Sequence, residues 1–163
     1  MTRHVLAVSL VVLMATLAGA DQVRVTARKV TLHERDGKAQ DRRRGTVTFT
    51  AKDVGYQFGL TRLVPTVTEN VSADWIVLVE GAAGRLHMGT RGQQDVQLPL
   101  GKEVEIETGP IHLEERSRTG GPNSGSVESS IFGYALRVVD SSGAVLLEKY
   151  DPPSVKDEID WKR

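Results

Sequence analysis

One stretch of the sequence, KEVEIETGPIHLEER at residues 102–116, gathers side chains that could do acid–base or metal chemistry. Its first half alternates glutamate with aliphatic residues, which is the pattern of a strand whose charged side chains share one face. Its second half alternates in the same way and presents His112 and Glu114. If Gly109-Pro110 is the two-residue loop of a hairpin, both charged sets lie on the same face of one strand pair.

This hairpin would place Glu105 directly opposite Glu114, and Glu107 opposite His112. Carboxylates directly opposite each other repel, and a hard cation such as calcium, which takes carboxylate oxygens, would relieve that repulsion. We therefore predict a cation patch of Glu105, Glu107, His112 and Glu114. The alternative is a solvated strand face, because surface charges usually have no further role.

The same four side chains support one catalytic hypothesis, a small exported carboxylate- or metal-assisted hydrolase. Paired carboxylates can divide the acid and base roles when their surroundings separate their pKa values. On an open strand face, however, little desolvation is available to separate them. The sequence also shows no nucleophile–base pair, so we predict no catalytic residue and favour a non-catalytic protein over the hydrolase.

Nucleotide, thiol and zinc chemistry find no motif in the chain. The run GGPNSGS at residues 120–126 does not match G-x-G-x-x-G, and Gly101-Lys102 lacks the earlier glycine of a P-loop because Val96 stands there. The chain has no cysteine, and His33, His87 and His112 are not at metal-ligand spacing. We predict no cofactor-binding residue, and calcium is the one candidate cofactor.

Two shorter motifs each have a functional and a plain interpretation. The basic run Arg42-Arg43-Arg44 could contact an acidic partner or a phosphate, but acidic residues nearby dilute it and favour a solvated loop. Asn70-Val71-Ser72 is a sequon for N-glycosylation, which has meaning only in a cell that glycosylates.

The N-terminus predicts export. A basic start with Arg3 and His4 precedes an uncharged run over residues 5–19, and small residues follow directly before Asp21. We therefore predict a signal peptide over residues 1–20, a periplasmic or extracellular location, and no stable membrane insertion after cleavage. The 21 basic and 21 acidic residues of the chain balance, which gives no electrostatic case for binding nucleic acid.

The mature sequence is patterned as short strands. Residues 23–27 alternate before a phase slip at Arg28-Lys29, which predicts either a β-bulge or a strand that switches sheets. Residues 45–52 alternate again, with Val47 and Phe49 on one face. We expect a loop over residues 33–45, with a turn at Asp36-Gly37. The further candidate strands are residues 75–81, 85–88, 95–98, 103–107, 111–116, 131–140 and 144–150.

These elements predict an all-β protein: a single antiparallel β-sandwich over residues 21–150, immunoglobulin-like in general architecture, followed by a C-terminal tail over residues 151–163. The turn Asp140-Ser141-Ser142-Gly143 predicts the final hairpin. In the tail, Ser154 and Asp157 could cap one helical turn.

The longest predicted connection, SRTGGPNSGSVESS at residues 117–130, is expected to be a mobile loop between two strands. Rigid strands with a long loop are typical of binding proteins, whose contact residues tend to lie in loops. We therefore predict an exported, non-catalytic binding or structural module that contacts a protein or a glycan through its loops.

Overall fold

The computed structural model describes residues 22–41, 45–120 and 124–161. The predicted signal peptide and Arg42-Arg43-Arg44 lie outside these described residues. Within them, no helix is long and apolar enough to cross a membrane. The strands are β1 Val23–Asp41, β2 Gly45–Arg62, β3 Asn70–Glu80, β4 Leu86–Gln97, β5 Glu103–Glu107, β6 Ile111–Thr119, β7 Gly125–Glu128, β8 Ser130–Asp140 and β9 Val145–Asp151, with a 3-10 turn η1 at Ala82–Gly84 and a helix α1 at Val155–Glu158.

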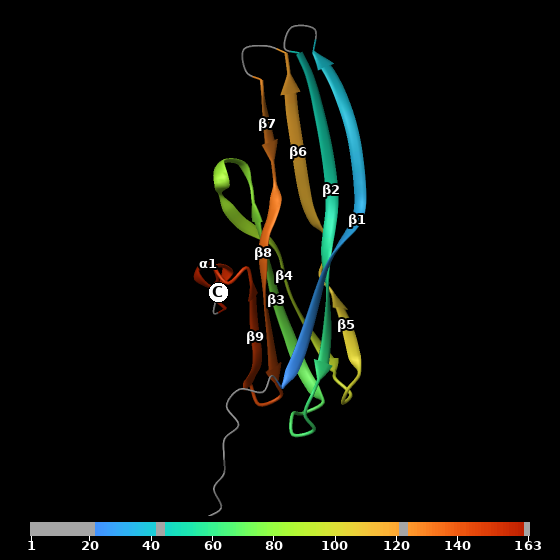
Figure 1. Cartoon of the computed structure of the whole chain (residues 1–163), viewed down its shortest axis with the longest axis vertical. Coiled ribbons are helices and arrows are strands. Elements are labelled where there is room, and N and C mark those ends of the chain that lie inside the picture. The colour runs from blue at the N-terminus through green and yellow to red at the C-terminus, as the bar shows by residue number, and fades with distance from the viewer. Residues whose placement is uncertain (1–21, 42–44, 121–123, 162–163) are drawn as a thin grey trace, which may run out of the picture.

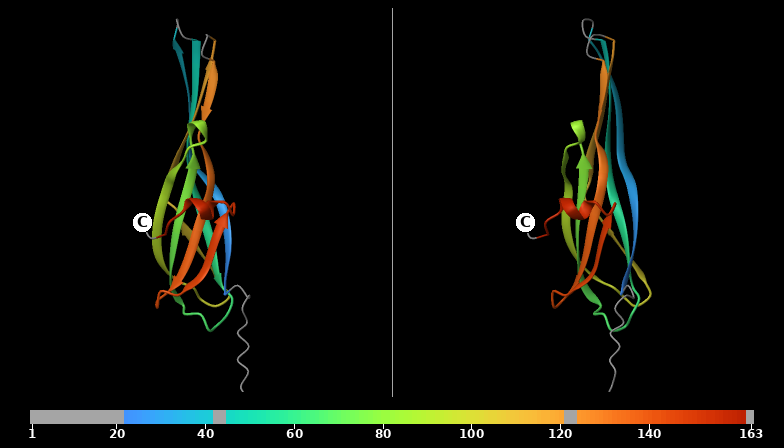
Figure 2. Two further views of the ribbon diagram at one scale, coloured as in Figure 1. Left: turned by 90° about the vertical axis from the view of Figure 1, so that its left-hand side faces the viewer. Right: turned by 60° about the vertical axis from the view of Figure 1, so that its left-hand side comes forward.

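The strands form two antiparallel sheets that lie face to face, which confirms the all-β prediction with two packed layers (Figures 1 and 2). The long sheet has the order β1-β2-β6-β7. Strand β5 pairs with the same edge of β2 as β6 does. It pairs with residues 57–61 of β2, whereas β6 pairs with residues 46–54. The short sheet has the order β4-β3-β8-β9, so the apolar strand predicted at residues 75–81 is central, as expected.

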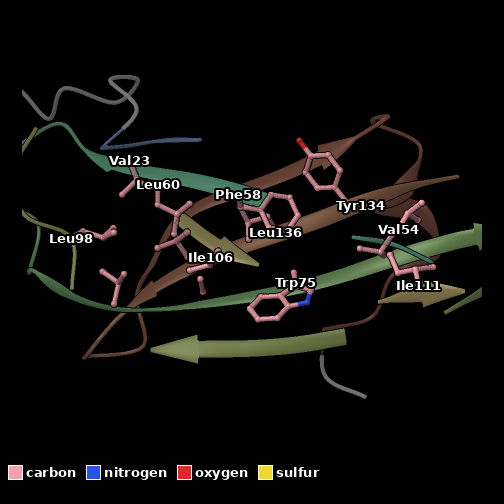
Figure 3. Packing of buried hydrophobic residues seen from close by; sticks show 14 of the residues in the cluster. Val23, Val54, Phe58, Leu60, Trp75, Leu98, Ile106, Ile111, Tyr134 and Leu136 are labelled. Carbon is pink, nitrogen blue, oxygen red and sulfur yellow. The ribbon is translucent and has the colours of Figure 1, made fainter. Parts of the chain in front are cut away.

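The hydrophobic core fills the space between the two sheets. Side chains at alternate positions of β2, including Val54, Phe58 and Leu60, meet Trp75 and Leu136 of the short sheet (Figure 3). Full burial of one such side chain stabilises the fold by roughly 1.5–3 kcal/mol. This core holds a chain without cysteine together.

The long sheet continues past the short sheet as a single layer (Figures 1 and 2). We call this extension the arm and define it as residues 33–41 of β1, residues 45–53 of β2, residues 112–119 of β6, and β7. The rest of the long sheet, which faces the short sheet, is called the base. The face of the long sheet that points away from the core is called its outer face.

The arm contradicts the prediction of a loop over residues 33–45 with a turn at Asp36-Gly37. Both residues lie within β1, where Asp36 pairs with Thr50 and Gly37 pairs with Phe49. The Thr50 hydroxyl donates a hydrogen bond to Asp36 Oδ1 at 2.7 Å, and Lys52 Nζ lies 3.0 Å from Glu34 Oε1. These cross-strand contacts stabilise the extended pairing and override the local turn signal.

The mobile loop predicted at residues 117–130 is also wrong over most of its length. Ser117 continues β6, and Ser126 lies opposite it in β7, so this segment forms a hairpin whose residues 121–123 lie outside the described part. Ser129 connects β7 of the long sheet to β8 of the short sheet. Its hydroxyl accepts a hydrogen bond from the Glu114 N–H at 2.7 Å and donates one to the Glu114 carbonyl at 3.0 Å.

The segment predicted as a tail packs against the short sheet. Val155 of α1 is fully buried beside Ile76, Leu78 and Ala135. Trp161 stacks on Arg137 with the guanidinium carbon 4.6 Å from the ring centroid. The predicted helical turn is confirmed at Val155–Glu158, but Ser154 forms no side-chain cap hydrogen bond.

Three smaller predictions have mixed outcomes. The turn at residues 140–143 is confirmed, because the Gly143 N–H donates to the Asp140 carbonyl at 3.0 Å. The two strands predicted at residues 85–88 and 95–98 are one strand, β4. The bulge predicted at Arg28-Lys29 is not present, and β1 instead shifts its register between Thr31 and His33.

Candidate functional site

The hairpin behind the predicted cation patch is not formed. Glu107 pairs with Gln57 and Ile111 pairs with Val54, so β5 and β6 follow each other along one edge of β2. Thr108 bridges them, because its N–H donates to the Tyr56 carbonyl and its hydroxyl accepts from the Tyr56 N–H, both at 2.9 Å. The Thr108 hydroxyl thus accepts the hydrogen bond that a backbone carbonyl would accept in a regular strand pair. Gly109-Pro110 separates β5 from β6 along β2 and does not form a turn.

The four predicted site residues therefore separate into two pairs. Glu105 lies opposite Gly59 in the base, whereas Glu114 lies opposite Ala51 in the arm. No group of three or more His, Cys, Asp or Glu side chains that could hold a metal ion occurs within the described ranges. The opposed carboxylates that motivated both calcium and the hydrolase do not face each other, so both hypotheses lose their structural basis.

His112 and Glu114 belong instead to a chain of ion pairs on the outer face of the arm. His112 Nδ1 lies 2.8 Å from Asp53 Oδ1, and His112 Nε2 lies 3.4 Å from Glu114 Oε1. Arg116 Nη2 continues the chain at 3.0 Å from Glu114 Oε2. The hydrogen bond to Asp53, assisted by Glu114, raises the pKa of His112 above its usual value. All of these side chains are accessible to water, so the chain of ion pairs is a surface feature.

Strand β2 reverses the polarity of its two faces between the base and the arm. In the base, even-numbered residues such as Phe58 and Leu60 point into the core. In the arm, the apolar residues are the odd-numbered Val47, Phe49 and Ala51, and the ladder of β2 with β6 shows no register shift. Successive side chains of a strand alternate strictly, so these apolar residues lie on the outer face.

The inner face of the arm is correspondingly polar. It carries Thr46, Thr48, Thr50 and Lys52, all of which are half-buried. This face is the continuation of the core side, and threonine and lysine suit it because water replaces the missing layer. The sequence thus matches the arm as a single layer with its apolar residues turned outward.

Two cross-strand rows make up the apolar part of the outer face. In one row Phe49 lies between Gly37 and Arg116, and Val127 follows beyond Arg116. In the other row Val47 lies beside Arg118. Phe49 and Val127 are 43% and 53% exposed, which is high for large apolar side chains in a sheet. Arg116 and Arg118 are the charged residues of these two rows.

A shallow depression of about 300 Å³ lies on this surface, lined by Val47, Phe49, Ala51, Glu114 and Arg116 among others. We call Val47, Phe49, Val127, Arg116 and Arg118 the arm patch. An exposed apolar cluster with arginine at its side is the composition that protein interfaces favour.

The outer face of the base carries both charges: Arg24 and Arg28 of β1 lie on one side of β2, and the acidic residues of β5 lie on the other. Glu103, Glu105 and Glu107 project from it in one line along β5. The Thr26 hydroxyl donates to Glu103 Oε2 at 3.1 Å, and Gln57 Nε2 donates to Glu107 Oε1 at 2.6 Å. A second depression, of about 250 Å³, lies among these residues and includes Gly59.

No protein-family model and no curated protein sequence matches the chain. Among solved structures, the X-ray structure of Northeast Structural Genomics Consortium target SoR45 is similar with a TM-score of 0.42 at 8% sequence identity, covering 79% of this chain and 81% of that chain. A likeness at this level carries no argument about function.

The sequence pattern identified two of the five arm-patch residues, Val47 and Phe49. The alternation of Val47 and Phe49 was visible, but an alternating pattern does not say which side of a sheet is covered. One feature of the sequence does indicate the outer face. The apolar residues of β2 are odd-numbered at Val47–Ala51 and even-numbered from Val54 onward, so the apolar side of the strand changes between them. Arg118 and Val127 were missed because their segment was taken for a loop.

Proposed function

We propose that this protein is an exported, non-catalytic binding or structural module with an immunoglobulin-like sandwich, which contacts another polypeptide or a glycan through the outer face of its arm. The expectation of contact through mobile loops is thereby replaced by contact through a strand face.

The strand order supports the immunoglobulin-like part of the proposal. In the short sheet, β3 and β8 are central, with β4 beside β3 and β9 beside β8. This corresponds to the order C′-C-F-G in immunoglobulin variable domains, and β1, β2 and β5 then correspond to strands A, B and E. Trp75 is buried on β3, at the strand where those domains keep a core tryptophan. The chain has no cysteine, so their disulfide has no counterpart.

The predicted signal peptide supports export. A cleaved chain would begin near Asp21, directly before β1. N-terminal sequencing of the protein from the exported fraction tests this part. A chain that still begins at Met1 and remains inside the cell would contradict it.

One observation carries the proposed contact: the apolar residues of β2 in the arm face water. The ladder of β2 with β6 is regular, so the apolar residues stay on the outer face along the whole arm. Exposed apolar clusters of this kind mark interaction sites or aggregation liabilities. The flanking arginines and the polar inner face make a defined contact surface the better account.

A photo-crosslinking amino acid placed at position 49 tests the contact in the exporting cell. Position 48 is the matched control, because Thr48 lies next to Phe49 on β2 but on the inner face. We expect discrete crosslinked species from position 49 and none from position 48. Equal yields at the two positions, or none at either, would overturn the proposal.

A further inference from the structure

We propose that the outer face of the long sheet binds a second copy of this chain, with the arm of each copy lying against the base of the other. This inference rests on the proposed function, because it names the partner of the same surface. The two long sheets run in opposite directions and are related by a two-fold axis that passes near Asp53 of each copy.

Charge complementarity is the first argument. Strands β5 and β6 occupy one edge of β2, and on the outer face β6 carries Arg116 and Arg118 while β5 carries Glu105 and Glu107. One line of the surface therefore has a basic end in the arm and an acidic end in the base. Such a surface is complementary to a copy of itself turned end to end.

The register of the strands supports a single axis for both charge pairs. Arg118 pairs with position 47 of β2 and Glu105 pairs with position 59, which are equally far from Asp53 on either side. Arg116 and Glu107 pair with positions 49 and 57, which are again equally far from Asp53. A two-fold rotation about Asp53 thus places Arg118 against Glu105 and Arg116 against Glu107 of the other copy.

An exposed apolar residue lies close to this axis. Leu32 is the bulged residue of β1 and is 54% exposed. Its Cδ1 lies 3.5 Å from where a β-carbon on Gly55 would be, so it covers the outer face near Asp53. In the dimer the two Leu32 side chains flank the axis and shield each other from water, which gives the centre of the interface an apolar contact.

The depression in the base fits the same arrangement. It lies over Gly59, with Glu103 and Glu105 on the β5 side and Arg28 on the β1 side. Arg28 donates to Gln57, and the two carboxylates on the β5 side suit the guanidinium of Arg118.

Another occupant fits this face less well. An anionic membrane would be attracted by Arg116 and Arg118 but repelled by the three glutamates of β5 on the same face. In this two-fold dimer the arm and the base of each copy are both covered by the other copy. No free contact surface is left, so assembly stops at two copies.

Sedimentation velocity of the mature chain over a range of concentrations tests the proposal. We expect a monomer–dimer equilibrium that weakens as salt is added, since exposed charge pairs are screened. The double variant R116E/R118E and the double variant E105K/E107K should each dimerise at least about 100-fold more weakly, because like charges then face each other. An equimolar mixture of the two variants should recover dimers, since every facing pair is again of opposite sign.

Matched controls separate this contact from a general effect of net charge. The inner-face variant K38E/K52E has the same net charge change as R116E/R118E, and E115K/E128K has the same change as E105K/E107K. Both controls should dimerise as the unaltered chain does. A monomeric unaltered chain, polymers beyond the dimer, failure of the mixture to recover, or loss of dimers in the controls would each overturn the proposal.

The two proposals fail in different ways. If the unaltered chain is monomeric but position 49 still crosslinks in the cell to a different polypeptide, the contact function stands and self-association is wrong. If position 49 forms no crosslink at all, both fall.

Discussion

Phe49 lies across the backbone of Gly37, its partner in the ladder of β1 with β2. A β-carbon built on Gly37 would fall 2.1 Å from Cζ of Phe49, which leaves no room for any side chain at this position. An aromatic ring that covers a cross-strand glycine on an edge strand stabilises the pairing. Gly37 therefore determines where the Phe49 ring, the one aromatic side chain of the arm patch, lies.

The substitution G37A should displace the Phe49 ring. Because that ring is partly exposed and can turn outward, we expect a modest loss in the free energy of unfolding, about 1 kcal/mol, together with weaker dimerisation. Urea unfolding and sedimentation measure the two effects. G125A is the control, because a β-carbon there has no heavy atom within 4 Å. Unchanged dimerisation in G37A would separate Phe49 from the contact.

The same geometry recurs in the core with a different expected outcome. A β-carbon on Gly92 would fall 2.3 Å from Cζ2 of Trp75, which is buried between the sheets. This ring cannot turn outward, so we expect G92A to cost more than G37A, about 2–3 kcal/mol in the free energy of unfolding. Urea unfolding of G92A and G37A measures the two losses in the free energy of unfolding. If G92A lost no more than G37A, the Trp75 ring would not be fixed in the core as described.

The C-terminal segment should contribute to stability although it follows the last strand. Val155 is fully buried and its Cγ2 lies 2.6 Å from where a β-carbon on Gly133 would be. We expect V155A to lower the free energy of unfolding by about 1–3 kcal/mol. The neighbouring exposed Lys156 gives the control K156A, which should change it by less than about 0.5 kcal/mol. If both variants unfold alike, the segment is not part of the cooperative unit.

His112 should make the stability of the arm depend on pH. Its pKa is raised in the folded chain, chiefly by the hydrogen bond to Asp53, from an ordinary value of 6.5. A raised folded-state pKa means that protonated His112 stabilises the fold below about pH 6.5, and that this contribution is lost as the pH rises through the folded-state pKa.

A titration of the His112 ring by NMR measures this directly. The substitution D53N removes the main partner and should lower the midpoint of the titration. Thermal melts of H112N should also be flatter with pH than those of the unaltered chain. An unchanged midpoint in D53N would show that the contact does not exist in solution.

The period-two alternation of the sequence was enough to predict the sandwich, because strands that bury one face obey that pattern. In β5, for example, Val104 and Ile106 alternate with exposed glutamates. It failed in the arm, where Asp36-Gly37 has the composition of a turn but lies under Phe49 of the next strand. A local pattern cannot report a partner ring more than ten residues away.

The candidate site was mispredicted for a related reason. Gly109-Pro110 resembles a hairpin loop, yet Thr108 continues the pairing with Tyr56, so the chain keeps its direction. The four residues of the predicted cation patch were correctly placed on strands, but the strands follow each other instead of facing each other. Glu105 and Glu107 therefore belong to the acidic side of the base, whereas Glu114 lies in the arm, and only the topology reveals this separation.

The most direct test of the account uses the absence of cysteine from the chain. One preparation carries V47C in the arm, another carries Q57C in the base, and the two are mixed with a short thiol crosslinker. Position 47 faces position 59 of the other copy, and Gln57 is the next outer-face side chain along β2 from position 59. The account therefore predicts a heterodimer joined from position 47 to position 57, and none when T48C on the inner face replaces V47C. Equal crosslinking from T48C and V47C, or no crosslinking from either, would contradict the claim that the outer face of the arm binds the base of a second copy.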